Sequence, residues 1–481
     1  MYIFKSKVSD EIKRENTESI EDDNEEGNKI QSPEEKERKK KAEQYVQSSY
    51  NNFLLHLKDG DEAYQKDSKN SKKMEIHSYN RDFIWFFFLG ILPYNDPSKW
   101  NNIITDQRSQ YDNFKKKLIT KDINDFIEVK KEKDKYALYY KFKEILSNED
   151  YSLLDLIKID VKRTFQKIEL FLLDKIQKIL ITVLYIFAKN NKEIGYRQGM
   201  SELCAIFLYV LYKEQVLRQA FIKDKDSFLF FVFHSNNNFL ENDTFIMFQK
   251  FMSKGFISFF KYNDEKYCDG DLSRLDIEQK KSLTRKEIIK ANDSDLKKRI
   301  YLLYYDKFPL IDKNLYQFLS EKIEPEIFLL KWYICVFTRE FEINKVVHLW
   351  DLILLYEYIA GKLSRNNEKN KKIKDAYDIK KKYNIDIKDN NNIINIGNDK
   401  MKDNNNINNK NDEEMNLNRQ YIFMDYIALS MILKIKNVIL KKKNLSQLTA
   451  FLMKYPKDID LYDICKTALD IFYKFNPNIK E

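Results

Sequence analysis

The sequence predicts an all-α protein, and three observations support that class. The chain has 9 glycine and 7 proline residues among 481, and hairpin-rich folds use many of both at their turns. Hydrophobic residues make up 43% and aromatic residues 14%, which indicates a large folded core. Apolar residues also recur at spacings of three and four, the period of amphipathic helices. We therefore expect an irregular domain of many helices, interrupted by disordered low-complexity insertions.

The chain opens with a charged, polar tail over residues 1–41. It contains an acidic run, Glu21–Glu26, and a basic run, Lys39–Lys41. We expect this tail to be disordered, because it has too few apolar residues to form a core. The start of the chain also lacks the apolar segment of a secretory signal.

The main part of the domain is expected over residues 42–365. The longest apolar run of the chain is Phe83–Pro93, which is well below the ~18 residues that a membrane-spanning helix needs. We therefore expect a cytoplasmic protein without a membrane span. Segments 203–211 and 346–355 are apolar on nearly all sides, which is typical of central helices. A further helix from residue 172 carries one buried stripe: Leu173, Ile176, Ile179, Leu180, Val183, Leu184 and Phe187.

Two polar segments interrupt this pattern. Residues from about 264 to 299 are expected to be an insertion, whose charged residues could still form a solvent-facing helix. Residues 366–418 are rich in Asn and Lys, and we expect them to be a disordered insertion because little apolar surface offsets the entropy of ordering. Residues 419–481 would then supply C-terminal helices that complete the domain.

Two short stretches carry most of the functional information: Ile157–Thr164 and Tyr196–Met200. They contain an arginine and a glutamine, the side chains that GTP hydrolysis on a small GTPase needs. The planar guanidinium of Arg163 can neutralise charge spreading over a transferring phosphoryl group better than a lysine can. The amide of Gln198 both donates and accepts, so it can hold an attacking water in line with the γ-phosphate.

A simpler interpretation of the first stretch is available. Asp160 and Arg163 are three residues apart, so on a helix they share a face and could form only a surface ion pair. The second stretch favours the catalytic interpretation, because Gly199 permits close backbone approach or an unusual dihedral beside Gln198. We expect Tyr196 to be structural.

Asp160 would orient the loop that bears Arg163, and Thr164 would support it. A helix of ~20 residues, roughly 30 Å long, separates Arg163 from Gln198. The connecting chain must therefore double back if the two side chains are to meet, and spacing alone does not supply that geometry.

The two stretches resemble the TBC-domain GTPase-activating proteins for Rab GTPases, whose fingerprints read I-x-x-D-x-x-R and Y-x-Q-G. Both are intact here. The similarity extends over roughly residues 80–475. Other segments that resemble the family are its opening R-x-x-x-W helix at Arg81–Trp85 with Leu89–Pro93 behind it, its second half at Pro325–Trp332, Thr338–Phe341 and Leu349–Asp351, and its late helix at Phe423–Ala428.

Within the family, the chain is most similar to the retromer-associated endosomal branch. That branch has an Asp-Val-x-Arg-Thr-Phe run and a Met-x-Glu-Leu run, which are similar to Asp160–Phe165 and Met200–Leu203 here. One position departs from the pattern. Many members carry proline after Arg-Thr-Phe, whereas this chain has Gln166, so we expect a less rigid loop after Arg163.

The resemblance implies that Arg163 and Gln198 enter the active site of a GTP-bound Rab in trans, with Gln198 replacing the water-positioning glutamine of the GTPase. The chain would then be an enzyme activator. It would need no cofactor of its own, because GTP and Mg²⁺ are bound to the partner. An endosomal coat complex is a candidate second partner, and recruitment to endosomal membranes would be peripheral, through such partners.

Other residues exclude several function classes. The net charge is +9, but 75 acidic residues are interleaved with 84 basic ones, which is typical of solvated helix faces and predicts no nucleic-acid partner. The four cysteines and four histidines are scattered, so we expect a reducing compartment, no disulfide framework and no metal site.

Trp85, Trp332 and Trp350 are expected in the core. Arg339 and Glu340 either contact the GTPase or tie helices together.

The alternative function is a non-catalytic Rab-binding or coat-binding scaffold that has kept the TBC fold. Intact Arg163 and Gln198 argue against it, since a scaffold has no need of both. A helical solenoid would show repeats at a fixed period, and we find none.

Overall fold

The computed structural model describes residues 81–93, 99–128, 135–221, 239–261, 294–361 and 421–476. Within these ranges every regular element is a helix, which confirms the predicted all-α class. The charged tail at 1–41, residues 42–80 and the Asn/Lys-rich segment at 366–418 lie outside the described residues.

The fold has an N-terminal and a C-terminal half. The elements of the N-terminal half are α5 (Arg81–Phe88), α6 (Trp100–Leu118), α7 (Lys121–Glu128), α8 (Lys135–Ile145), α9 (Asn148–Arg163), η2 (Glu169–Leu172), α10 (Asp174–Asn190), α11 (Met200–Phe221), α13 (Leu240–Ser253) and η4 (Phe256–Phe260). Those of the C-terminal half are α16 (Asp295–Tyr301), η6 (Leu302–Lys307), η7 (Phe308–Leu310), α17 (Lys313–Ser320), α18 (Glu326–Ile334), α21 (Phe423–Lys434), α22 (Lys436–Ile439), α23 (Leu445–Met453) and α24 (Leu461–Phe475).

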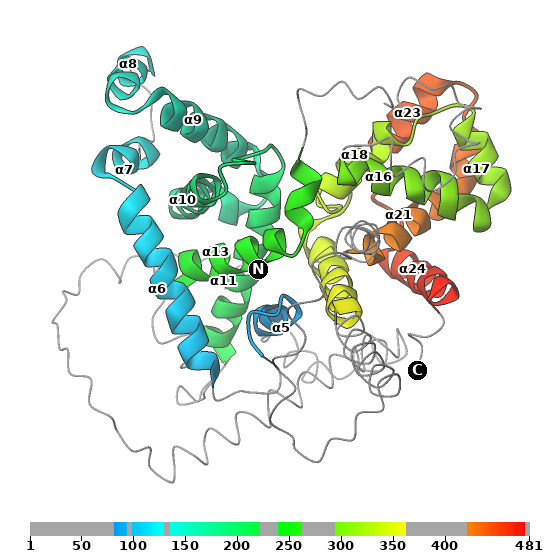
Figure 1. Cartoon of the computed structure of the whole chain (residues 1–481). Coiled ribbons are helices and arrows are strands. Elements are labelled where there is room, and N and C mark those ends of the chain that lie inside the picture. Colours follow the sequence, from blue (N-terminus) through cyan, green and yellow to red (C-terminus); the bar gives the residue numbers. More distant parts are fainter. Residues whose placement is uncertain are drawn as a thin grey trace, which may run out of the picture.

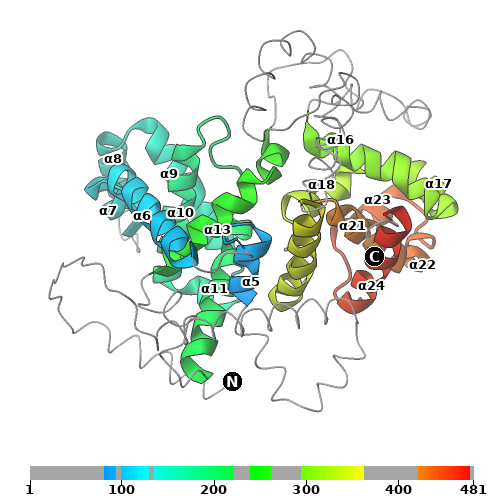
Figure 2. The same cartoon turned by 60° about the horizontal axis from the view of Figure 1, so that its bottom comes forward.

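A long helix over residues 343–361 joins the halves. It lies between α5 and α11 on one side and α21 and α24 on the other, and both views show this arrangement (Figures 1 and 2). The opening helix is tied to it directly. Asp351 accepts hydrogen bonds from Arg81 Nε at 3.1 Å and from Trp85 Nε1 at 2.8 Å.

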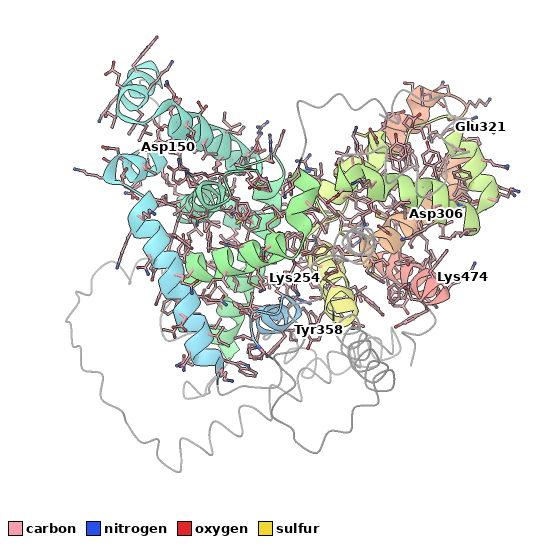
Figure 3. The ribbon with its side chains drawn as sticks, in the orientation of Figure 1. Asp150, Lys254, Asp306, Glu321, Tyr358 and Lys474 are labelled. Atoms are coloured by element: carbon pink, nitrogen blue, oxygen red, sulfur yellow. The ribbon has the colours of Figure 1, made fainter. Side chains whose placement is uncertain are left out.

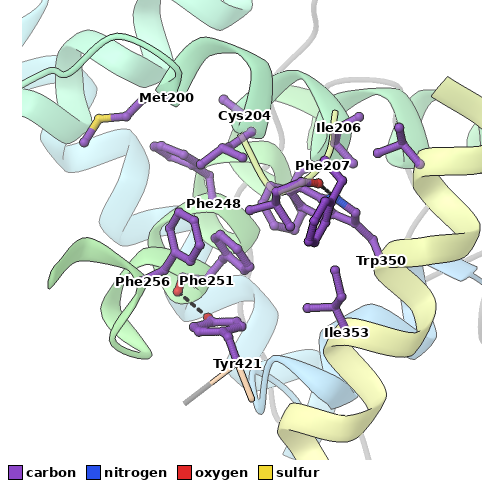
Figure 4. Packing of buried hydrophobic residues seen from close by; sticks show 14 of the residues in the cluster. Met200, Cys204, Ile206, Phe207, Phe248, Phe251, Phe256, Trp350, Ile353 and Tyr421 are labelled. Atoms are coloured by element: carbon purple, nitrogen blue, oxygen red, sulfur yellow. Dashed lines mark hydrogen bonds between the residues drawn. The ribbon is translucent and has the colours of Figure 1, made fainter. Parts of the chain in front are cut away.

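The core continues from one half into the other through aromatic side chains. Figure 4 shows Phe207 of α11, Phe251 of α13 and Trp350 packed together, with ring centroids 5.3 Å and 5.4 Å from Trp350. The hydroxyl of Tyr421 donates to the carbonyl of Phe251 at 2.7 Å. The three tryptophans expected in the core, Trp85, Trp332 and Trp350, are buried.

Helix α9 is well specified by its sequence. Its N-cap residue, Ser147, accepts a hydrogen bond from the Asp150 amide at 3.0 Å, and cationic residues fill its last turn, as the helix dipole favours. Asp150, labelled in Figure 3, also accepts through Oδ1 from Tyr185 Oη at 2.7 Å and Lys189 Nζ at 2.8 Å. These two hydrogen bonds hold α9 against α10. The apolar stripe predicted for α10 is buried apart from Leu173, which precedes the helix and is exposed.

Residues 262–293, most of the expected polar insertion, lie outside the described residues, and the structure differs from the expectation at the end of that segment. Residues 294–299 were expected at the end of a polar insertion, but they begin α16, which packs into the C-terminal half. Leu296 is fully buried and Arg299 is 4% exposed. Arg299 Nε and Lys307 Nζ each lie 2.7 Å from a carboxylate oxygen of Asp425 on α21. A charged side chain can be buried when it has a partner of opposite charge. The charged composition of this segment, taken alone, predicts that it is exposed to solvent.

Candidate functional site

Arg163 is the last residue of α9, and its side chain is 59% exposed. Its Nη2 lies 2.8 Å from Oδ1 of Asp160, and its Nε donates to the Ile159 carbonyl at 3.3 Å. The ion pair that the simpler interpretation expected is therefore present. Asp160 itself is 5% exposed, so the pair joins a buried carboxylate to a guanidinium that reaches into solvent.

The second stretch forms the turn that leads into α11. Tyr196 is buried, and Gln198 is exposed just before the helix begins at Met200. The Tyr196 hydroxyl donates to Oδ2 of Asp160 at 3.0 Å. Burial, reinforced by Asp160, raises the pKa of Tyr196, so the hydroxyl stays protonated and keeps donating.

Asp160 thus connects the two stretches, with one carboxylate oxygen on Arg163 and the other on Tyr196. A second contact lies beside it. Thr164 Oγ1 is 3.0 Å from Ser201 Oγ in the first turn of α11 and donates to the Asp160 carbonyl at 2.9 Å. The chain therefore does double back through α10, and the turns that carry Arg163 and Gln198 are held side by side.

Gly199 has both an unusual backbone dihedral and a close neighbour, the two properties that the sequence suggested for the residue beside Gln198. Its φ is +101°, a conformation that L side chains rarely adopt. A Cβ built at this position would lie 3.1 Å from Cγ2 of Ile334 and 3.9 Å from Sγ of Cys335. The turn that presents Gln198 therefore packs directly against the end of α18.

The segment after Arg163 leaves the helix through an unusual backbone conformation. Phe165 has a φ of +45°, which is uncommon for a residue other than glycine. Gln166, where many relatives have proline, donates from Nε2 to the Lys162 carbonyl at 2.9 Å. That this loop is less rigid than in other members stays a prediction.

Helix α9 also presents an exposed apolar face next to Arg163. Leu156 and Ile159 are each 44% exposed. Residues spaced by three, four and seven share one side of a helix, so Leu156, Ile159 and Arg163 face the same way. Leu154 and Ile157 fill the opposite, buried side.

Arg339 and Glu340 tie elements together in this structure. Arg339 Nε lies 2.8 and 2.9 Å from the two carboxylate oxygens of Glu202, in the first turn of α11. Glu340 is buried and lies 2.7 Å from Lys331 Nζ on α18. The sequence analysis missed Ser201 and Glu202 as neighbours of the site, because no local pattern links them to residues 36 or more positions away.

Within the described ranges, no group of three or more His, Cys, Asp or Glu side chains is arranged to hold a metal ion. None of the helices in those ranges combines the length and apolar composition needed to cross a membrane.

Comparison with known proteins places these observations in a family. Residues 78–277 and 281–365 match the family described as Rab-GTPase-TBC domain. That match includes both stretches of the candidate site and the segment with Arg339.

Individual relatives agree. The chain is 29% identical over 294 residues to human TBC1 domain family member 5, an alignment that covers 57% of this chain and 34% of the relative. It is 24% identical over 302 residues to the GTPase-activating protein GYP1 of Saccharomyces cerevisiae, covering 62% and 38% of the two chains. The chain thus spans about a third of the human relative's length.

The fold is also similar to a solved one. The crystal structure of the Ypt/Rab-GAP domain of Gyp1p superposes with a TM-score of 0.50 at 16% identity, covering 84% of this chain and 89% of that domain. At this identity the likeness supports the fold.

Proposed function

We propose that this chain, which belongs to the Rab-GTPase-TBC domain family, accelerates GTP hydrolysis by a Rab-family small GTPase. The observation that carries the proposal is that buried Asp160 contacts both the Arg163 side chain and the turn that presents Gln198. Arg163 pairs with one of its carboxylate oxygens, and the turn of Gln198 is held by the other through Tyr196. The named relatives support the activity class, since one is called a GTPase-activating protein.

Arg163 would enter the Rab active site as an arginine finger. Charge builds up on the phosphoryl oxygens during transfer, and an arginine supplied in trans stabilises it, which raises the rate by about 10³ to 10⁵. The side chain is placed for such a role, because it extends from a helix end into solvent, where one carboxylate and the Ile159 carbonyl hold it.

Gln198 would position the attacking water in place of the glutamine of the GTPase. It lies at the N-terminal end of α11, on a turn fixed by the left-handed Gly199 and by buried Tyr196. Its exposed amide can donate to one group and accept from another. Asp160, Tyr196, Thr164 and Gly199 would act as supporting residues that hold both fingers in place.

The Rab would contact the exposed apolar face of α9. Leu156 and Ile159 lie on the same side of the helix as Arg163, and apolar residues around a charged anchor exclude water from an interface. The Rab is expected in its GTP-bound form, with GTP and Mg²⁺ supplied by the partner.

The cellular setting is proposed from the relatives. The similarity to TBC1 domain family member 5, together with the subfamily motifs, favours endosomal vesicle traffic, with an endosomal coat complex as a candidate second partner. The alternative, a non-catalytic Rab-binding or coat-binding scaffold, would leave the exposed positions of Arg163 and Gln198 without a purpose.

A single-turnover GTPase assay over a panel of Rabs tests the proposal. We expect the chain to stimulate at least one Rab strongly and the Gln198→Ala variant to stimulate it far less. A Rab whose own switch glutamine is changed to leucine should keep much of the stimulated rate, because Gln198 positions the attacking water in its place. If that Rab variant fails to respond at all, the dual-finger mechanism is wrong. If every Rab binds and none is stimulated, the scaffold alternative is correct.

A further inference from the structure

The turn that carries Gln198 is held from the C-terminal half of the fold. Residues 334–339, which we call the brace segment, run from the last residue of α18 into the turn after it and pack against the start of α11. A Cβ at Gly199 would lie 3.1 Å from Cγ2 of Ile334, which is closer than most such contacts, and 3.9 Å from Sγ of Cys335, an ordinary van der Waals distance. The turn beside Gln198 therefore packs closely against the end of α18.

A charged contact fixes the same turn from a second side. Arg339 lies across the carboxylate of Glu202, with Nε at 2.8 and 2.9 Å and Nη2 at 2.8 Å. Thr338 Oγ1 donates to the same carboxylate at 3.0 Å. Such multi-point pairs of a guanidinium with a carboxylate are directional as well as strong. Glu202 follows Gln198 by four residues, so this contact holds the first turn of α11, directly after Gln198.

The brace segment itself has a strained backbone. Val336 and Phe337 have φ values of +45° and +59°, and both side chains are fully buried. Left-handed backbone at residues other than glycine is unfavourable and persists only where the surroundings enforce it. Here burial enforces it, as does a hydrogen bond of 3.1 Å from Trp350 Nε1 to the Val336 carbonyl. The segment thus presents Thr338 and Arg339 from a fixed position.

We propose that Arg339 is a positioning residue for Gln198 and acts through Glu202. The inference rests on the proposed function, in which Gln198 holds the attacking water. A misplacement of about 1 Å can slow a positioned reaction about 10²-fold, and the brace segment restrains a displacement of that size. Arg339 does not touch GTP or the reacting water in this account. Its guanidinium is occupied by Glu202, although 40% of its side chain is exposed.

A double-mutant cycle separates positioning from direct contact with the Rab. Arg339→Ala should lower the single-turnover rate of GTP hydrolysis, measured at a saturating concentration of this protein, by about ten- to a hundredfold. The concentration that gives half of the maximal rate should change little. In the Gln198→Ala background Arg339→Ala should have no further effect, because nothing remains to be positioned. Arg339→Lys should recover part of the rate, since lysine restores the charge without the two-point contact. Lys434→Ala, which removes an ion pair with Asp463, serves as the control and should leave the rate unchanged.

Equal slowing by Arg339→Ala in both backgrounds, or a change confined to the half-saturating concentration, would overturn the proposal in favour of direct contact. Hydrogen exchange of the chain alone provides a readout that does not depend on GTPase activity. Arg339→Ala should raise exchange in residues 198–204 while leaving α13 unchanged. Unchanged exchange at 198–204 would also overturn the proposal, even if no Rab responds to the wild-type chain and the proposed function itself fails.

Discussion

Two buried aspartates, one in each half of the fold, each accept hydrogen bonds from a tyrosine and an arginine, but the two arginines differ in their exposure to solvent. Asp160 accepts from the Tyr196 hydroxyl at 3.0 Å and from Arg163 at 2.8 Å. Asp425 accepts from the Tyr333 hydroxyl and from Arg299, both at 2.7 Å. The difference lies in the arginine, because the side chain of Arg299 is 5% exposed and that of Arg163 is 59% exposed.

The difference in exposure gives the two arginines different roles: Arg299 is structural, whereas Arg163 is accessible to a partner. Arg299 cannot leave Asp425 without becoming a buried charge that has lost its carboxylate, although Lys307 would stay on Asp425, so the pair contributes to the fold. Arg163 also pairs with a buried aspartate through its Nη2 atom, but most of its side chain is exposed to water. It can turn toward another anion from solvent, while the Tyr196 hydroxyl still donates to Asp160. We infer that the exposure of the arginine, rather than the identity of its partners, distinguishes the candidate finger.

The largest expected effect concerns activity at the exposed arginine. Arg163→Lys should lower the stimulated GTPase rate by on the order of 10³, because lysine keeps the charge but loses the planar fork that spans two phosphoryl oxygens. The midpoint of urea unfolding should not change, since the side chain is mainly solvated. Single-turnover kinetics and a urea titration of the same preparation check both statements. A variant within a few-fold of wild type would show that a point charge is enough.

The next effect concerns stability at the buried arginine. Asp425→Asn leaves Arg299 and Lys307 without a carboxylate, and breaking such a buried pair costs about 3–5 kcal/mol of unfolding free energy. Urea unfolding at pH 7 measures this loss. A difference under about 1 kcal/mol would mean that the cluster contributes no more than an exposed ion pair does.

The same cluster should also make stability depend on pH. Burial alone would raise the pKa of Asp425, but Arg299 and Lys307 outweigh it and lower the pKa below its ordinary value of 3.8. The folded-state pKa is thus below the unfolded one, so the carboxylate adds stability above about pH 4 and loses it as the pH falls through the lowered pKa. The gap between wild type and Asp425→Asn should stay constant from pH 7 to about 5 and narrow in stronger acid.

The two clusters also differ in how far the sequence predicts them. Arg163 and Gln198 stand in recognisable fingerprints, and the helical period of the surrounding segments predicts the all-α class. Arg299 lies in a charged stretch, and composition indicated a solvated insertion there. Its partner is 126 residues away. Long-range pairs leave no local pattern, so neither this cluster nor the contact of Arg339 with Glu202 could be predicted.

A smaller effect is expected on the exposed face of α9. Ile159→Asp should raise the half-saturating concentration for the Rab about tenfold, the size typical of losing an interface anchor, while the saturated rate changes little. Leu310, an apolar residue of η7 that is 64% exposed, supplies the matched control. Leu310→Asp should behave as wild type, and equal behaviour of the two variants would place the Rab elsewhere.

The smallest effect is expected from deleting residues 366–418. The backbone amide of Tyr421 donates to the Glu357 carboxylate, so the chain returns close to the helix that it left, and a short Gly/Ser linker can span the gap. Loop closure changes by only ~0.6 kcal/mol per doubling of length. We expect Tm within a few degrees of wild type and full GAP activity toward the same Rab. Loss of either would show that the segment packs on the domain.

The most direct test of the account compares Arg163→Ala with Arg299→Ala in one experiment, with single-turnover GTPase rates and urea unfolding measured for each. We expect Arg163→Ala to lose about 10³ to 10⁵ in stimulated rate, or roughly 4–7 kcal/mol of barrier lowering, and to lose less stability than Arg299→Ala, because Tyr196 still donates to buried Asp160. Arg299→Ala should lose about 3–5 kcal/mol of stability and keep most of its stimulated rate wherever it remains folded. An Arg163→Ala variant that stimulates its Rab within a few-fold of wild type would contradict the central claim.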